Sequence, residues 1–96
     1  MKMLVIIYSG SHPQQITSLL DQHHAEGYTE FRNAHGVGSS GKREGSRAWP
    51  GESTLWVSIV LEPRAKKLME SLREESSQLS TGERMHVAML PTESFF

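Results

Sequence analysis

The sequence predicts an α+β protein in which two helices cover one face of a four-stranded antiparallel sheet. Three observations predict this fold class. An apolar, β-branched run stands near the N-terminus, two segments carry apolar residues at helical spacing, and the segments follow one another as strand, helix, strand, strand, helix, strand. That order is the ferredoxin-like βαββαβ arrangement, whose right-handed crossovers place both helices on the same face of the sheet.

The first half of the chain contributes a strand, a helix and a second strand. Residues 2–8 (KMLVIIY) are almost entirely apolar, which is typical of a strand covered on both faces. Ser11 and Gln14 fit a capping box that starts a helix, and Gly27 ends it. The stripe of this helix is formed by Ile16, Leu19, Leu20 and His23. Residues 28–34 (YTEFRNA) lack such a stripe and favour a strand.

The third strand is predicted at residues 54–61 (TLWVSIVL), where side chains alternate between two faces. One face carries Leu55, Val57, Ile59 and Leu61, and the other carries Trp56, Ser58 and Val60. We expect the face with Trp56 to lie away from the helices. Because an exposed apolar face usually marks an interface, we predict a homo-oligomer whose sheets meet there. A lone exposed tryptophan is the alternative.

The last two elements are a helix and a short strand. Pro63 stands in the first turn of the helix, a position that suits proline. The buried stripe of the helix is formed by Ala65, Leu68, Met69 and Leu72. Residues 85–90 (MHVAML) are predicted to form the final strand.

Composition limits the function classes. The length suits one domain over residues 1–96, and 36% hydrophobic with 22% charged residues is ordinary for a soluble globular protein. A net charge of −1 gives no field that would attract nucleic acid or an anionic membrane. There is no cysteine, so disulfides and thiolate chemistry are excluded. The apolar run at residues 3–8 is too short to span a bilayer, and we expect a cytoplasmic protein.

Residues 34–53 form a long glycine-rich connection between the second and third strands. The glycines match the dinucleotide pattern G-x-G-x-x-G, and Gly36 to Lys42 match Walker A apart from Arg43 at its last position. Both motifs require a helix directly after the glycines, and here a polar stretch and a strand follow instead. Glycine-rich backbone can still turn successive N–H groups toward an anion. A connection without a binding role is the alternative.

The chain resembles the PII-type signalling proteins over roughly residues 1–90. The residues EGYTEFRNAHGVGSSGK, at positions 26–42, are similar to the family's strand entry and the Gly-Phe-Gly segment leading into its T-loop. The residues STGER, at positions 80–84, are similar to its second ligand loop, where Thr-Gly recurs. Ser39 and Ser40 stand where the family has Arg-Gln, so the resemblance is to the divergent PII-like branch, often found beside metal-efflux or other transport functions.

This resemblance implies a trimeric, non-enzymatic regulator with an adenine nucleotide, or another small anion, bound between subunits. The implied ligand contacts are Gly36, Val37, Gly38, Ser39 and Ser40, with Thr81, Gly82 and Arg84 supplied across the interface. The T-loop of the family docks onto a membrane transporter or an enzyme. The implied partner contacts in residues 34–53 are Lys42, Arg43, Arg47 and Trp49, because arginine and tryptophan near a loop tip suit protein contact.

A metal-responsive binding protein is the alternative function. The residues RAWPGES, at positions 47–53, are similar to a segment of the trimeric CutA-type proteins, a related architecture linked to divalent metals. The chain has five histidines, and His35 and His86 are the candidate ligands. Solvated or hydrogen-bonded histidines remain the alternative at both positions. Enzymatic activity is not expected, because Asp21 is the only aspartate and no carboxylate pair stands out for acid–base chemistry.

Overall fold

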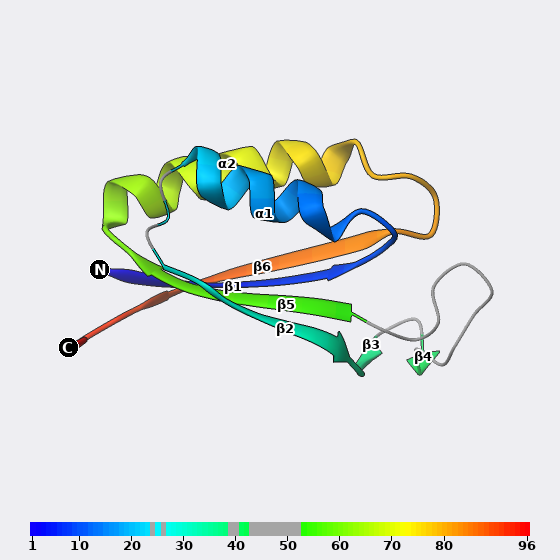
Figure 1. The fold of residues 1–96 in the computed structure, drawn as a ribbon, viewed down its shortest axis with the longest axis horizontal. Helices are drawn as coiled ribbons and strands as arrows, with labels where there is room; N and C mark the ends of the chain where they lie inside the picture. Colours follow the sequence, from blue (N-terminus) through cyan, green and yellow to red (C-terminus); the bar gives the residue numbers. More distant parts are fainter. Residues whose placement is uncertain (24, 26, 39–40, 43–52) are drawn as a thin grey trace.

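The computed structural model describes residues 1–23, 25, 27–38, 41–42 and 53–96. Its elements follow the predicted order, with two very short strands added in the long connection (Figure 1). They are β1 (Lys2–Ser9), α1 (Pro13–Gln22), β2 (Thr29–Ala34), β3 (Val37–Gly38), β4 (Gly41–Lys42), β5 (Ser53–Val60), α2 (Glu62–Ser77) and β6 (Arg84–Pro91). Both helices lie on one face of the main sheet, as the βαββαβ order predicts (Figure 1).

The main sheet has four strands in the order β2-β5-β1-β6, and all neighbouring strands are antiparallel. Strand β1 lies inside the sheet, where Val5 is opposite Val57 of β5 and Ala88 of β6. Near its end β2 shifts register, and Asn33 there has a positive φ of 59°. Asparagine tolerates this backbone better than most side chains, so the irregularity suits a bend into the long connection. Strands β3 and β4 form a separate two-stranded sheet.

Helix α1 begins one residue later than a capping box at Ser11 requires, and it ends at Gln22 and not at Gly27, so both predicted ends were wrong. The N-cap is His12, no side chain caps the helix, and Ser11 Oγ lies 3.0 Å from His12 Nδ1. Pro13 occupies the first turn, where the missing N–H needs no partner. The backbone N–H of His12 donates to Tyr8 Oη at 3.0 Å. The start of α1 is therefore held by β1.

The core lies between the helices and the sheet. Its fully buried side chains include Leu4, Ile6, Ile16, Leu20, Trp56, Leu68 and Leu72. Trp56 is 0% exposed, and Ser58 and Val60 are buried with it, so the prediction that this face of β5 lies away from the helices was wrong. Alternation defines the two faces of a strand but not which of them meets a helix. The register decides it here, because Trp56 is paired with Ile6, which is also fully buried.

The opposite face of the sheet carries the apolar side chains that we expected beneath the helices. Paired residues share a face in an antiparallel sheet, so the register assigns its members. They are Met3, Val5 and Ile7 of β1, Leu55, Val57 and Ile59 of β5, Ala88 and Leu90 of β6, and also Thr29, Phe31 and His86. We call this surface the open face; none of the described helices covers it (Figure 1). Ile7 is 40% exposed and Phe31 is 48% exposed.

Neither described helix has the length and the apolar content that crossing a bilayer requires.

Candidate functional site

The segment between α2 and β6 is a tight turn at residues 80–83. The N–H of Glu83 donates to the carbonyl oxygen of Ser80 at 3.0 Å, and Gly82 has a φ of 92°. Among the described residues, Asn33 is the only non-glycine with positive φ, so the φ of Thr81 is negative. This combination is a type II turn, which favours glycine at its third position. Gly82 is thus required by the turn, whether or not it touches a ligand.

The turn exposes hydrogen-bond donors next to a cation. Thr81, Gly82 and Arg84 are all exposed. Within the part of the chain that the structure describes, the N–H groups of Thr81 and Gly82 donate to no other residue. Successive free N–H groups in a turn attract anions, and the guanidinium of Arg84 adds a positive charge. The three residues that the sequence suggested here therefore lie together and are accessible.

Glu83 is the residue that sequence reasoning missed. Its side chain is only 6% exposed. Oε1 accepts a hydrogen bond from the backbone N–H of Ser80 at 3.0 Å, Oε2 accepts one from Tyr8 Oη, and His12 Nδ1 lies 3.8 Å from Oε2. The hydrogen bond from Tyr8 keeps the pKa of Glu83 below its ordinary value, although burial acts in the opposite direction. The only sequence signal was a carboxylate directly after a Thr-Gly turn.

Tyr8 anchors this carboxylate to the sheet. It is 2% exposed, accepts the N–H of His12 and donates to Glu83. Burial raises the pKa of Tyr8 from 10.0 to about 12, and the hydrogen bond to Glu83 adds to the rise. The phenol is therefore protonated, and remains a donor, throughout the physiological range.

The raised pKa predicts a loss of stability in strong alkali. Because the unfolded tyrosine ionises near 10.0 and the folded one near 12, the stabilisation is complete below pH 10 and is lost between pH 10 and 12. The shift corresponds to about 2–3 kcal/mol. We expect urea unfolding of the wild type to show this additional loss over that interval and Tyr8→Phe to lack it. Tyr28→Phe, which removes a phenol that is not bonded to Glu83, should behave as wild type; parallel curves for wild type and Tyr8→Phe would contradict the assignment.

The other predicted ligand segment lies at the same end of the sheet, opposite the two termini (Figure 1). Gly36 is exposed just after β2, and Val37 and Gly38 form β3, where they pair with Lys42 and Gly41. Ser39, Ser40, Arg43, Arg47 and Trp49 lie outside the described residues. The structure thus places the first three predicted contacts and Lys42, and does not describe the other five positions.

Two strands separate the two ligand segments within one subunit. Ala34 pairs with Ser53 of β5, and Arg84 pairs with Ser9 of β1. At about 4.8 Å per strand, three intervals put Ala34 and Arg84 about 14 Å apart. Between them the hydroxyls of Ser9 and Ser53 meet at 2.6 Å in a buried position. The end of β1 therefore lies between the turn at residues 80–83 and the root of the long connection.

The candidate metal ligands are not brought together. His35 follows the edge strand β2, whereas His86 lies on the opposite edge strand β6, where it faces Ile7 on the open face. Across the described ranges, no three histidine, aspartate or glutamate side chains converge as a metal site requires. His23 instead pairs with Ser71 Oγ at 2.8 Å, which joins α1 to α2.

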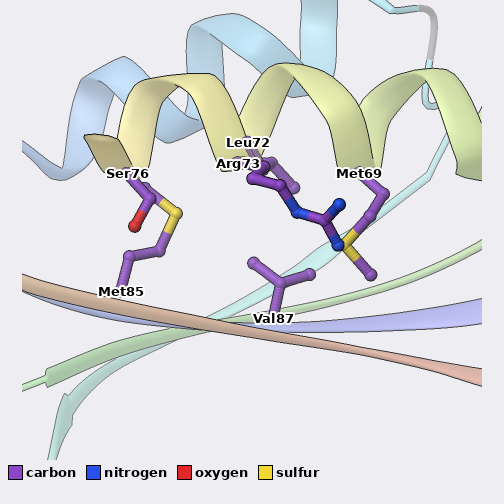
Figure 2. A pocket seen from close by; sticks show the side chains of 6 residues that line it. All are labelled: Met69, Leu72, Arg73, Ser76, Met85 and Val87. Carbon is purple, nitrogen blue, oxygen red and sulfur yellow. The ribbon is translucent and has the colours of Figure 1, made fainter. Parts of the chain in front are cut away.

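A cavity of about 150 Å³ lies between α2 and β6 (Figure 2). It is lined by Met69, Leu72, Arg73, Ser76, Met85 and Val87. Pockets for nucleotide-sized ligands typically measure about 300–1,000 Å³, so this cavity is too small for one. None of the residues predicted to bind a ligand lines it, and we assign the candidate site to the turn at residues 80–83.

Comparisons with known proteins agree with this fold. Residues 1–90 match the family model of the nitrogen regulatory protein P-II. CPII, a nitrogen regulatory PII-like protein from Thiomonas intermedia solved with ADP, AMP and bicarbonate, gives a TM-score of 0.68 at 28% identity, over 93% of this chain and 86% of that one. A PII-like signalling protein from Thermus thermophilus gives a TM-score of 0.61 at 27% identity, over 93% and 86%.

No curated protein sequence gives a significant match. The family match covers nearly the whole chain and confirms the resemblance to PII-type proteins. The chain belongs to the nitrogen regulatory protein P-II family.

Proposed function

We propose that this chain is a non-enzymatic PII-like regulator of the cytoplasm that binds an adenine nucleotide, or another small anion, in clefts between the subunits of a trimer. The observation that carries the proposal is the exposed turn at residues 80–83, where the N–H groups of Thr81 and Gly82 donate to none of the described residues and the exposed Arg84 follows directly after the turn. The relative from Thiomonas intermedia, which was solved with ADP, AMP and bicarbonate, supports this ligand class.

The distance between the two ligand segments supports a cleft completed by a second subunit. Inside one subunit Gly36 and the turn at residues 80–83 lie on opposite sides of β5 and β1. The open face supplies an apolar surface through which copies of the chain would associate, because such surfaces are rarely left in water. In the trimer, Gly36, Val37, Gly38, Ser39 and Ser40 of one subunit would then meet Thr81, Gly82 and Arg84 of the next.

The long connection at residues 34–53 is the proposed output of the regulator. Ligand binding at its root would act on this connection, and Lys42, Arg43, Arg47 and Trp49 would contact a transporter or an enzyme. The sheet end that carries the root also carries the ligand-binding turn (Figure 1). A ligand in the cleft would therefore contact the start of the output segment directly.

Calorimetry with ADP, AMP, ATP and cyclic AMP, each with and without bicarbonate, tests the proposal. We expect binding of at least one nucleotide, and Arg84→Ala should weaken it about tenfold or more, because a charge-assisted hydrogen bond contributes about 1.5–3 kcal/mol. Arg73→Ala is the matched control, since Arg73 is also exposed but lines the separate α2–β6 cavity. A folded wild type that binds none of these nucleotides would refute the ligand assignment.

A further inference from the structure

Two hydrogen bonds between Glu83 and Ser80 close the turn at residues 80–83. Glu83 donates its N–H to the carbonyl of Ser80, and its Oε1 accepts the N–H of Ser80. With this second bond, both main-chain polar groups of Ser80 are held by Glu83. Thr81 and Gly82 lie between these two points, so the Glu83 side chain adds a second constraint on the direction of their N–H groups.

The second oxygen of Glu83 attaches the turn to the sheet. Tyr8 donates to Oε2 from the end of β1, and Tyr8 is itself fixed by burial and by the N–H of His12. Because both carboxylate oxygens are engaged and the side chain is 6% exposed, Glu83 is not placed to touch a ligand itself. Its contacts all serve the shape and the attachment of the turn.

Gly10 leaves the space that the Tyr8–Glu83 pair occupies. A Cβ at Gly10 would overlap both Tyr8 Oη and Glu83 Oε2, more closely than real side chains approach. By contrast, a Cβ at Gly27 would meet nothing within 4 Å. The contact between the turn and β1 thus depends on the absence of a side chain at position 10.

We propose that Glu83 is the positioning residue of the anion-binding turn, held by Tyr8 in the space that Gly10 provides. This inference rests on the proposed function, because the turn is the ligand contact that it names. Glu83 acts by orienting the N–H groups of Thr81 and Gly82 toward the ligand, and its negative charge is not required for that. The Tyr8 hydroxyl and the missing side chain at Gly10 are as necessary as the hydrogen bonds of the Glu83 side chain.

The test measures ADP affinity in the assembled protein. We expect Gly10→Ala and Glu83→Ala to weaken ADP binding at least tenfold, whereas Gly27→Ala leaves it within twofold. Glu83→Gln should stay within about threefold of wild type, because its amide oxygen still accepts the Ser80 N–H and its NH₂ group donates to Tyr8 Oη. A requirement for the negative charge itself would instead make Glu83→Gln as harmful as Glu83→Ala.

Amide NMR separates a specific effect on the turn from a general loss of stability, because it reports on individual backbone amides. In wild type and Gly27→Ala, ADP should shift the Thr81 and Gly82 amide peaks; in Gly10→Ala these shifts should disappear while the core peaks of Leu4 and Leu72 stay unchanged. If Gly10→Ala does not fold, Tyr8→Phe decides, since it removes only the hydroxyl. Normal ADP affinity in Glu83→Ala and Tyr8→Phe would overturn the inference and leave the proposed function standing, whereas a wild type that binds no nucleotide refutes both.

Discussion

Replacing Trp56 with alanine should lower the free energy of unfolding by about 3–5 kcal/mol. Among the described residues, Trp56 has the largest fully buried side chain, and it is 0% exposed. It lies on β5 between Ile6 of β1 and Glu30 of β2, beneath the helices. A domain of this size has a total stability of about 5–15 kcal/mol, so the cavity left by the indole would remove a large part of it.

The indole of Trp56 also donates a hydrogen bond to a carboxylate. Trp56 Nε1 donates to Glu30 Oε1 at 3.0 Å, and Arg32 donates to Oε2 of the same group. The hydrogen bond from Arg32 lowers the pKa of Glu30, burial acts against it, and the bond from Trp56 also helps to keep the carboxylate ionised. Trp56→Phe retains most of the apolar volume and loses this donor, so we expect about 1–3 kcal/mol of destabilisation.

Urea unfolding at one protein concentration measures both changes, because the apparent stability of a protein that assembles depends on its concentration. Leu61→Ala is the matched control: Leu61 is 59% exposed beside the same strand, and its loss should cost at most about 0.5 kcal/mol. Equal midpoints for Trp56→Ala and Leu61→Ala would show that Trp56 does not occupy the core.

The second large effect is expected on the association of subunits into the proposed trimer. Val57→Glu should convert the proposed trimer into a folded monomer at micromolar concentration. Val57 lies in the middle of the open face, opposite Val5 and Thr29, and points away from the helices. A carboxylate buried there without a partner would cost several kcal/mol at each subunit contact, whereas in an isolated subunit it would remain in water.

Sedimentation gives the mass and circular dichroism gives the fold of the variant. Ser18→Glu introduces the same charge at an exposed position of α1, on the other side of the sheet (Figure 1), and it should leave the assembly intact. A wild type that sediments as a single subunit, or a Val57→Glu protein that keeps the wild-type mass, would show that the open face is not the subunit contact.

The sequence predicted some of the structural features on which these experiments rest and missed others. The apolar strands were predicted within a residue or two and the helical stripes located both helices, because such periodicities depend on neighbours along the chain, but α1 ends at Gln22 and not at the predicted stop, Gly27. The Thr-Gly pair before β6 likewise indicated a turn. The helix start was misjudged, because Ser11 bonds to His12 and the helix begins at Pro13 without a side-chain cap. Choosing between these two arrangements requires the position of Tyr8, which holds the backbone of His12.

By itself, the sequence determined the order of the elements, the long connection at residues 34–53 and the family. Each of these can be recognised from residues that are close together in the chain. The tertiary structure alone decided which face of β5 is buried and that Glu83 is tied to Tyr8, 75 positions away in the chain. A strand alternates in the same way whichever side the helices take, and a hydrogen bond between distant residues exists only once the register of the sheet has brought them together.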